Sequence, residues 1–208
     1  LVPNLREKFE GEARALAVLR HPNIVGLLQY GLMYGRPYLV MEYLENGIEL
    51  AKEIEYRANR GQRFEVTELW AIFSQLLDGL ESAHSKDIVH RDIKPDNLMV
   101  QSVEGNPRLL RIMDFGLAKI VTHSGTTMNT VGTPNYMAPE QLENKNIGPW
   151  TDLYAVGVMA FELMTGRPPF PGTSMQEVFA RKTDQTFDPV EALAGLDYPL
   201  PTQRFLRR

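Results

Sequence analysis

The sequence predicts an α+β fold in which a small β-rich part is followed by a larger, mostly helical part. Two observations carry this prediction. Apolar residues recur every three or four positions near the N-terminus and again over residues 67–85, which is the period of an amphipathic helix, and residues 152–165 are predicted to form a further, apolar helix. Between the first two of these helices lie two β-rich stretches, residues 24–30 and 37–43, joined by a Gly-containing segment.

The first helix is predicted over residues 5–20. Its apolar face comprises Leu5, Phe9, Ala13, Leu16 and Leu19. The sequence His21-Pro22-Asn23 ends this helix, because the residue before a proline avoids the α region. Residues 31–36 are the predicted hairpin connection between the two strands.

The central part of the chain combines one long helix with short strands. The helix over 67–85 has a wide apolar stripe, and Thr67 is its predicted N-cap. Short apolar runs at 88–89, 98–100 and 109–113 are separated by polar turns and predict small β ribbons.

The last third begins with a segment that has no clear period, residues 114–140, which is rich in Thr, Ser and Gly. Loops of that length inside a compact domain are usually functional. The helix over 152–165 then ends at Gly166. Weaker patterns predict a helix near 174–182 and another after Pro201.

The composition excludes several classes of protein. The 208 residues fit one domain, and 43% apolar with 23% charged residues argues against disorder and a coiled coil. A net charge of −4 gives no reason to expect nucleic-acid binding. The absence of cysteine removes disulfides, thiolate metal sites and thiol nucleophiles. No apolar run is long enough to span a bilayer and no signal peptide is visible, so we expect a cytoplasmic location.

The most informative stretch is His90-Arg91-Asp92-Ile93-Lys94-Pro95-Asp96-Asn97. Asp114-Phe115-Gly116 and Ala138-Pro139-Glu140 follow it in that order. These stretches resemble the catalytic loop, the metal-binding motif and the end of the activation segment of protein kinases. One Asp-Phe-Gly alone is weak evidence, but three motifs in order around a Thr-rich loop are specific. Lys94 and the later Gly-Arg-Pro-Pro-Phe at 166–170 resemble bacterial Ser/Thr kinases of eukaryotic type.

The resemblance implies a bilobal protein-kinase-like fold for residues 1–208. Residues 1–43 would form part of the β-rich N-lobe and the start of the hinge. Residues 44–208 would form a mostly helical C-lobe that lacks its last helices.

The resemblance also implies a reaction, transfer of the ATP γ-phosphate to a Ser or Thr hydroxyl of a protein by a non-specific protein serine/threonine kinase. Asp92 would orient the substrate hydroxyl and accept its proton, and Lys94 would neutralise the γ-phosphate. Asn97 and Asp114 would supply oxygen ligands to Mg2+, with Mn2+ as an alternative ion.

Other residues match the family's nucleotide site. Glu12 would pair with the lysine of a strand that precedes it in kinases. Met41 would be the gatekeeper, and the backbones of Glu42 and Leu44 would bind adenine. Met99 would lie beneath the adenine ring. Simpler interpretations stay open: Glu12 could form an i,i+4 pair with a lysine on its own helix, and both methionines could be core residues.

The Thr-rich loop is a candidate for regulation by phosphorylation. A phosphate on Thr127 or Thr130 could pair with Arg91 and Lys119 and order the loop. Thr133 would instead contact the catalytic loop, as this position does in Ser/Thr kinases. Hydroxyl-rich loops without a regulatory role are the alternative.

The Gly-rich loop and the paired lysine of kinases would lie before Leu1, so we expect a kinase fragment, truncated at both ends, with little activity of its own. A pseudokinase-like scaffold and a small-molecule phosphotransferase are the alternatives. Retention of Asp92, Lys94, Asn97 and Asp114 together favours an active kinase whose partners are ATP and Ser- or Thr-containing proteins. A membrane segment elsewhere in a longer protein stays open.

Overall fold

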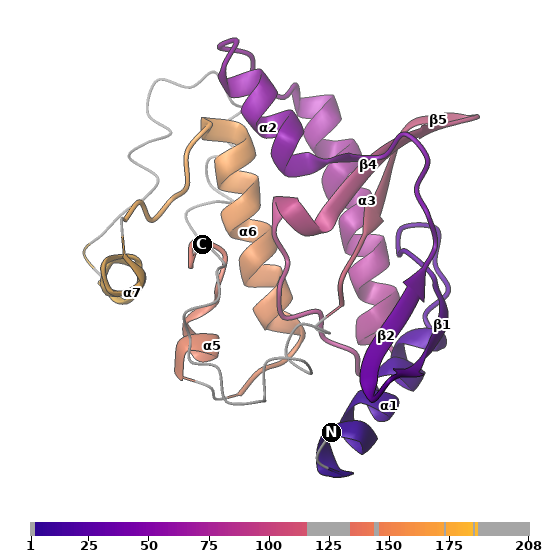
Figure 1. Ribbon diagram of the computed structural model, residues 1–208. Coiled ribbons are helices and arrows are strands. Elements are labelled where there is room, and N and C mark those ends of the chain that lie inside the picture. Colours follow the sequence, from indigo (N-terminus) through magenta and orange to yellow (C-terminus); the bar gives the residue numbers. More distant parts are fainter. Residues whose placement is uncertain (1–2, 116–133, 144–145, 173, 185, 187–208) are drawn as a thin grey trace.

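The computed structural model describes residues 3–115, 134–143, 146–172, 174–184 and 186. The helices are α1 (Pro3–Ala17), α2 (Leu50–Ala58), α3 (Val66–His84), the short 3-10 helix η1 (Pro95–Asn97), α5 (Pro139–Glu143), α6 (Pro149–Thr165) and α7 (Met175–Thr183). The strands are β1 (Leu27–Met33), β2 (Arg36–Met41), β3 (Ile48–Glu49), β4 (Leu98–Val103) and β5 (Asn106–Ile112). The predicted mixture of small sheets and a larger helical part is therefore confirmed (Figure 1).

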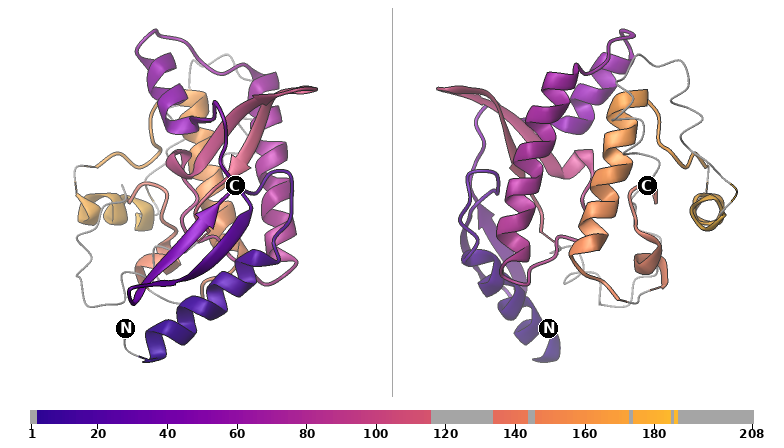
Figure 2. Two further views of the ribbon diagram at one scale, coloured as in Figure 1. Left: turned by 45° about the vertical axis from the view of Figure 1, so that its right-hand side comes forward. Right: turned by 180° about the vertical axis from the view of Figure 1, so that it is seen from behind.

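A small N-terminal unit consists of α1 and the antiparallel β1–β2 ribbon, which lie together at one end of the molecule (Figure 2). Phe9 of α1 is 3% exposed, and its ring meets that of Tyr30 edge-on at 6.4 Å. The ribbon turns at Tyr34 and Gly35, both at positive φ, which is the backbone of a tight two-residue hairpin. The predicted six-residue connection was therefore too long.

The first predicted strand began too early. The predicted strand covered 24–30, whereas β1 begins at Leu27. Ile24 instead forms a bridge to Ile112 at the end of β5, and Val25 N donates to Ile112 O at 2.9 Å. These residues thus tie the small unit to the larger one.

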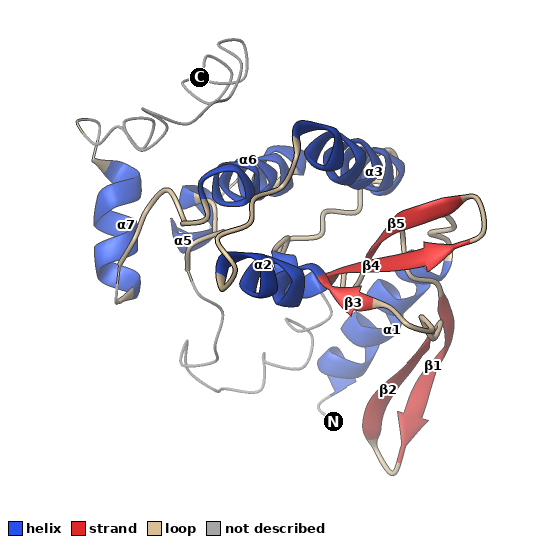
Figure 3. Ribbon diagram, turned by 90° about the horizontal axis from the view of Figure 1, so that it is seen from above, coloured by secondary structure: helices blue, strands red, loops and turns tan. Residues whose placement is uncertain are grey.

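The core of the larger unit lies between α3 and α6, which pack against each other, and the sheet of β3, β4 and β5 (Figure 3). Leu76 of α3 and Met159 of α6 are both fully buried. The helix predicted over 152–165 is confirmed as α6, which begins three residues earlier at Pro149 and has Gly166, with a φ of 75°, as its C-cap. The left-handed cap requires a residue without a Cβ penalty, so glycine suits this end.

Two further details differ from the predicted elements. The long helix α3 begins at Val66, so Glu65 holds the cap position and its N–H donates to Glu68 Oε2 at 2.8 Å, while Thr67 lies in the first turn. Residues 88–89 are not a strand. The helix expected after Pro201 lies outside the described residues. No helix in the described ranges is long and apolar enough to cross a membrane.

Candidate active site

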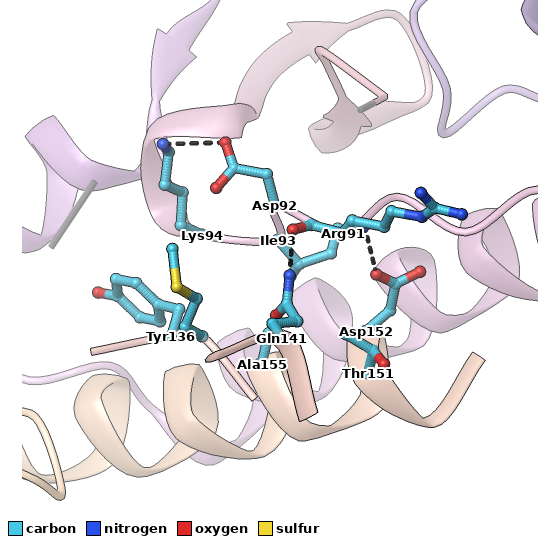
Figure 4. Close-up of a pocket in the computed structure, with 10 residues that line it drawn as sticks. Arg91, Asp92, Ile93, Lys94, Tyr136, Gln141, Thr151, Asp152 and Ala155 are labelled. Carbon is cyan, nitrogen blue, oxygen red and sulfur yellow. Dashed lines mark hydrogen bonds and ion pairs between the residues drawn. The ribbon is translucent and has the colours of Figure 1, made fainter. Parts of the chain in front are cut away.

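The loop between α3 and β4 brings three predicted site residues together. Asn97 Nδ2 donates to Asp92 Oδ2 at 2.9 Å and to the Asp92 carbonyl at 2.7 Å. Lys94 Nζ lies 3.0 Å from Asp92 Oδ2, and Figure 4 shows these two side chains pointing toward each other. The Asp92 side chain is 44% exposed, so its carboxylate is accessible to a substrate. The loop thus presents one carboxylate supported by an ammonium and an amide.

A buried carboxylate on α6 holds this loop in place. Asp152 is 1% exposed and accepts hydrogen bonds from the backbone N–H groups of His90 at 2.9 Å and Arg91 at 2.8 Å. His84 Nε2 lies 2.7 Å from the same carboxylate. The resemblance to the kinase family predicts a contact of Asp152 with the backbone near residues 90–91, and the structure confirms it. The other interpretation of Asp152, an N-cap, is wrong because α6 begins at Pro149.

The backbone at Arg91 adopts a left-handed conformation, with a φ of 67°. Such a conformation is unfavourable for a long side chain and persists only where the surroundings impose it. Here Asp152 binds the Arg91 N–H, and Gln141 Nε2 donates to the Arg91 carbonyl at 2.8 Å (Figure 4). Contacts from α5 and α6 therefore fix the peptide groups that precede Asp92.

His90 is a structural residue in this site. It is fully buried, its Nε2–H donates to the Met113 carbonyl at 2.7 Å, and its Nδ1 accepts from Asp92 N at 3.2 Å. Its ring lies 4.6 Å from that of Phe115. Burial lowers the pKa of His90, which favours the neutral imidazole that these two hydrogen bonds require.

Asp114, the second predicted metal ligand, directly follows Met113, whose carbonyl accepts the hydrogen bond from His90. Met113 N donates to the Asn97 carbonyl at 2.9 Å, so the two ligand-bearing segments are joined by a backbone hydrogen bond. Asp114 is exposed and has a φ of 53°. Since the Asn97 amide nitrogen is bound to Asp92, its Oδ1 atom is the one available to a cation. One carboxylate and one amide oxygen fit Mg2+, which takes its other ligands from phosphates and water.

The predicted adenine-binding backbone lies just after β2. Glu42 N donates to Gly26 O at 2.8 Å, and Gly47 N donates to Leu44 O at 3.2 Å. Among the described residues, neither the Glu42 carbonyl nor the Leu44 N–H has a hydrogen-bond partner. The Glu42 carbonyl and the Leu44 N–H are therefore one acceptor and one donor with which a planar base could form hydrogen bonds.

Side chains around this segment restrict its position. Arg111 of β5 pairs with Glu42, and although burial raises the pKa of that carboxyl, the hydrogen bond from Arg111 makes the net shift downward. Met41 ends β2 and Met99 lies on β4. A Cβ on Gly47 would lie 2.8 Å from the Met99 methyl, so the end of the Met99 side chain would have to shift to accommodate a larger residue there.

The site also contains contacts of Tyr136 and Gln141 that no local sequence pattern indicated. Tyr136 donates its hydroxyl hydrogen bond to Glu162 of α6, and burial raises the pKa of both groups. Gln141, which binds the Arg91 carbonyl, also accepts from Ala138 N at 3.0 Å. These contacts join residues that are far apart in sequence, so no spacing rule could reveal them.

Several predicted site residues have side chains outside the described part of the chain. Glu12 lies on α1, but its side chain is outside the described part of the chain. Lys119, Thr127, Thr130 and Thr133 fall within residues 116–133, which also lie outside it. Their expected roles stay predictions.

Comparisons with known proteins give one consistent result. Residues 3–204 match the model of the protein kinase domain. The chain is 39% identical over 176 residues to serine/threonine-protein kinase Pkn1 of Myxococcus xanthus, which covers 82% of this chain and 24% of that protein. It is 40% identical over 166 residues to the probable serine/threonine-protein kinase pknA2 of Bifidobacterium longum, covering 79% of this chain and 21% of that protein. The chain therefore spans about a quarter of the length of these curated relatives.

A solved structure agrees with this result. The kinase domain of Mycobacterium tuberculosis PknI, in a form with a single substitution, superposes with a TM-score of 0.64 at 27% sequence identity. The alignment covers 81% of this chain and 60% of the PknI chain.

Proposed function

This chain belongs to the protein kinase family, with Ser/Thr kinases as relatives, and from that premise we propose that it transfers the γ-phosphoryl group of ATP to Ser or Thr hydroxyls of proteins. The observation that carries the proposal is the arrangement of Asp92, Lys94 and Asn97 beside the segment that ends in Asp114. A scaffold that only binds has no chemical need for this set of groups.

In the proposed reaction Asp92 receives the hydrogen bond of the substrate hydroxyl and then its proton. Lys94, now paired with Asp92 at 3.0 Å, is close enough to stabilise charge on the transferred phosphoryl group. Asn97 and Asp114 would hold Mg2+, or Mn2+ in its place, and the bound ion would neutralise phosphate charge.

The remaining roles are also proposals. The Glu42 carbonyl and the Leu44 N–H would bind the adenine edge, with Met41 and Met99 against the base. Glu12 would support a lysine that holds the ATP phosphates. Phosphorylation of Thr127 or Thr130 would engage Arg91 and Lys119, while Thr133 would contact the catalytic loop.

The partners that follow are ATP and Ser- or Thr-containing proteins, and the reaction would take place in the cytoplasm, where ATP is available. These statements concern residues 1–208 alone, because the chain spans about a quarter of the length of the relatives it matches.

The experiment is phosphotransfer from ATP labelled in its γ-phosphate to a generic Ser/Thr protein, using the protein expressed from its complete gene. We expect Asp92→Asn to lower kcat by about 10²- to 10⁴-fold, since it removes the proton acceptor. The KM for ATP should change little. Asp78→Asn, the same substitution at an exposed position of α3, is the matched control.

The alternatives give different results in the same assay. ATP binding with no transfer to protein by the wild type would indicate a pseudokinase-like scaffold. Label that appears on a small molecule and not on protein would indicate a small-molecule phosphotransferase. Unchanged activity in Asp92→Asn would contradict the proposed role of that carboxylate.

A further inference from the structure

Lys182 on α7 contacts three backbone carbonyls of one short segment. Its Nζ atom lies 2.9 Å from Pro134 O, 2.7 Å from Asn135 O and 2.5 Å from Met137 O. An ammonium has three N–H donors, so all of them are used by residues 134–137. We call these four residues the clamped segment. The contact is specific in geometry, because the three acceptors converge on one nitrogen.

The surroundings of this ammonium are mostly apolar. The rings of Tyr154 on α6 and Phe170 lie 5.2 Å and 5.7 Å from the nitrogen. No carboxylate in the described part of the chain forms an ion pair with Lys182. Burial lowers the pKa of the lysine to about 8. A buried cation needs compensation in such a place, and among the described residues the three carbonyls are what supplies it.

The clamped segment forms part of the wall of the active site. Tyr136 and Met137 line a small cavity of about 20 Å³ together with Asp92 and Lys94. The segment also continues into Ala138, whose N–H binds Gln141, and Gln141 binds the carbonyl of Arg91. A path of direct contacts therefore runs from α7 through the clamped segment to the residue before Asp92.

We propose that Lys182 is a positioning residue for the protein substrate. By fixing the carbonyls of residues 134–137, it holds the wall against which the hydroxyl-bearing segment of the substrate docks beside Asp92. The substrate named in this inference rests on the proposed kinase function, whereas the contacts of Lys182 do not depend on that function. The inference predicts an effect on the binding of the protein substrate and no effect on the binding of ATP. The reason is that α7 lies at the opposite side of the molecule from β2, which directly precedes the proposed adenine-binding residues Glu42 and Leu44 (Figure 3).

The kinetic test uses the protein expressed from its complete gene. Lys182→Met and Lys182→Gln should raise the KM for a generic Ser/Thr protein by about tenfold, since hydrogen bonds to a charged donor are lost. The KM for ATP should stay within about twofold. Lys182→Arg, which keeps the charge and several donors, should restore at least part of the affinity. Arg181→Met removes the neighbouring cation on the same helix and should behave as wild type.

A second measurement does not depend on activity. Hydrogen exchange at the amides of Met137 and Ala138 should be faster in Lys182→Met and Lys182→Gln than in Arg181→Met, because the segment loses its anchor. If the wild type transfers no phosphate, the proposed function fails while this measurement still tests the clamp. If Lys182→Met does not fold, Lys182→Gln decides. Equal exchange and equal KM values in the Lys182 and Arg181 variants would overturn the inference, as would a parallel rise in both KM values.

Discussion

His90 shows how burial decides what an ionisable residue does. From sequence, a histidine two residues before the proposed catalytic aspartate could be a proton acceptor, but the resemblance to kinases places His90 in the column of residues that links the two lobes and predicts a structural role. In the fold it has no access to solvent, and both ring nitrogens are used, one by Met113 O and the other by Asp92 N. A group in this situation links two motifs and takes no part in proton transfer.

This environment predicts how stability depends on pH. The pKa of His90 in the folded protein is below its ordinary value of 6.5, so the unfolded chain binds a proton first as the pH falls. The contribution of the neutral ring to the free energy of unfolding should be fully present above about pH 6.5 and decrease as the pH falls toward the folded-state pKa. Urea unfolding at pH 7.5 and pH 5.5 measures the loss.

The assignment to His90 needs its own control. His90→Asn keeps a polar group without a titrating ring, and the stability of this variant should change less between the two pH values. An NMR titration of the imidazole provides the direct check. A ring that is protonated at pH 6.5 in the folded protein would contradict the prediction.

At the scale of elements, α3 and α6 form the support on which the active site is built. Asp152 of α6 and His84 of α3 meet at the catalytic loop, and the apolar faces of the two helices form much of the core beneath it. The apolar stripe of α3 and the nearly continuous apolar run of α6, which is followed by Gly166, were sufficient to predict the two helices. The short strands were harder to predict, since residues 24–25 are extended but pair with β5 and not with β2.

A pair of neighbouring leucines on α3 tests the importance of this support. Leu76 is fully buried and Leu77 is 42% exposed. Leu76→Ala should lower the free energy of unfolding by about 2–5 kcal/mol, because it leaves a cavity in the core. Leu77→Ala makes the same chemical change at the surface and should cost less than about 1 kcal/mol. Equal losses in chemical denaturation would show that the two helices do not pack as described.

At the scale of the whole molecule, the active site depends on parts that lie far apart in the chain. The proposed nucleotide side comes from residues after β2 and from β4, the proposed catalytic loop follows α3, and the proposed substrate side comes from the clamped segment and α7. We therefore expect the proposed activity to require all of these parts together.

The corresponding prediction concerns the 208 residues on their own. A polypeptide of residues 1–208 should phosphorylate a generic Ser/Thr protein at a small fraction of the rate of the protein from the complete gene. The reason is that none of these residues supplies the Gly-rich loop and lysine with which kinases hold ATP phosphates. Both proteins should be assayed at the same concentration with Mg2+ and labelled ATP. Comparable rates would contradict the prediction.

The sequence by itself determined the family, the mixed fold, the long helices and the candidate catalytic residues. This was possible because helical periods and linear motifs are properties of neighbouring residues, and the three kinase motifs stand in order from residue 90 to residue 140. Only the tertiary structure decided how the site is held. Gln141, Tyr136 and Lys182 reach partners that lie far away in sequence or on another element. Such contacts depend on where the chain folds back on itself, and a local pattern contains no record of that.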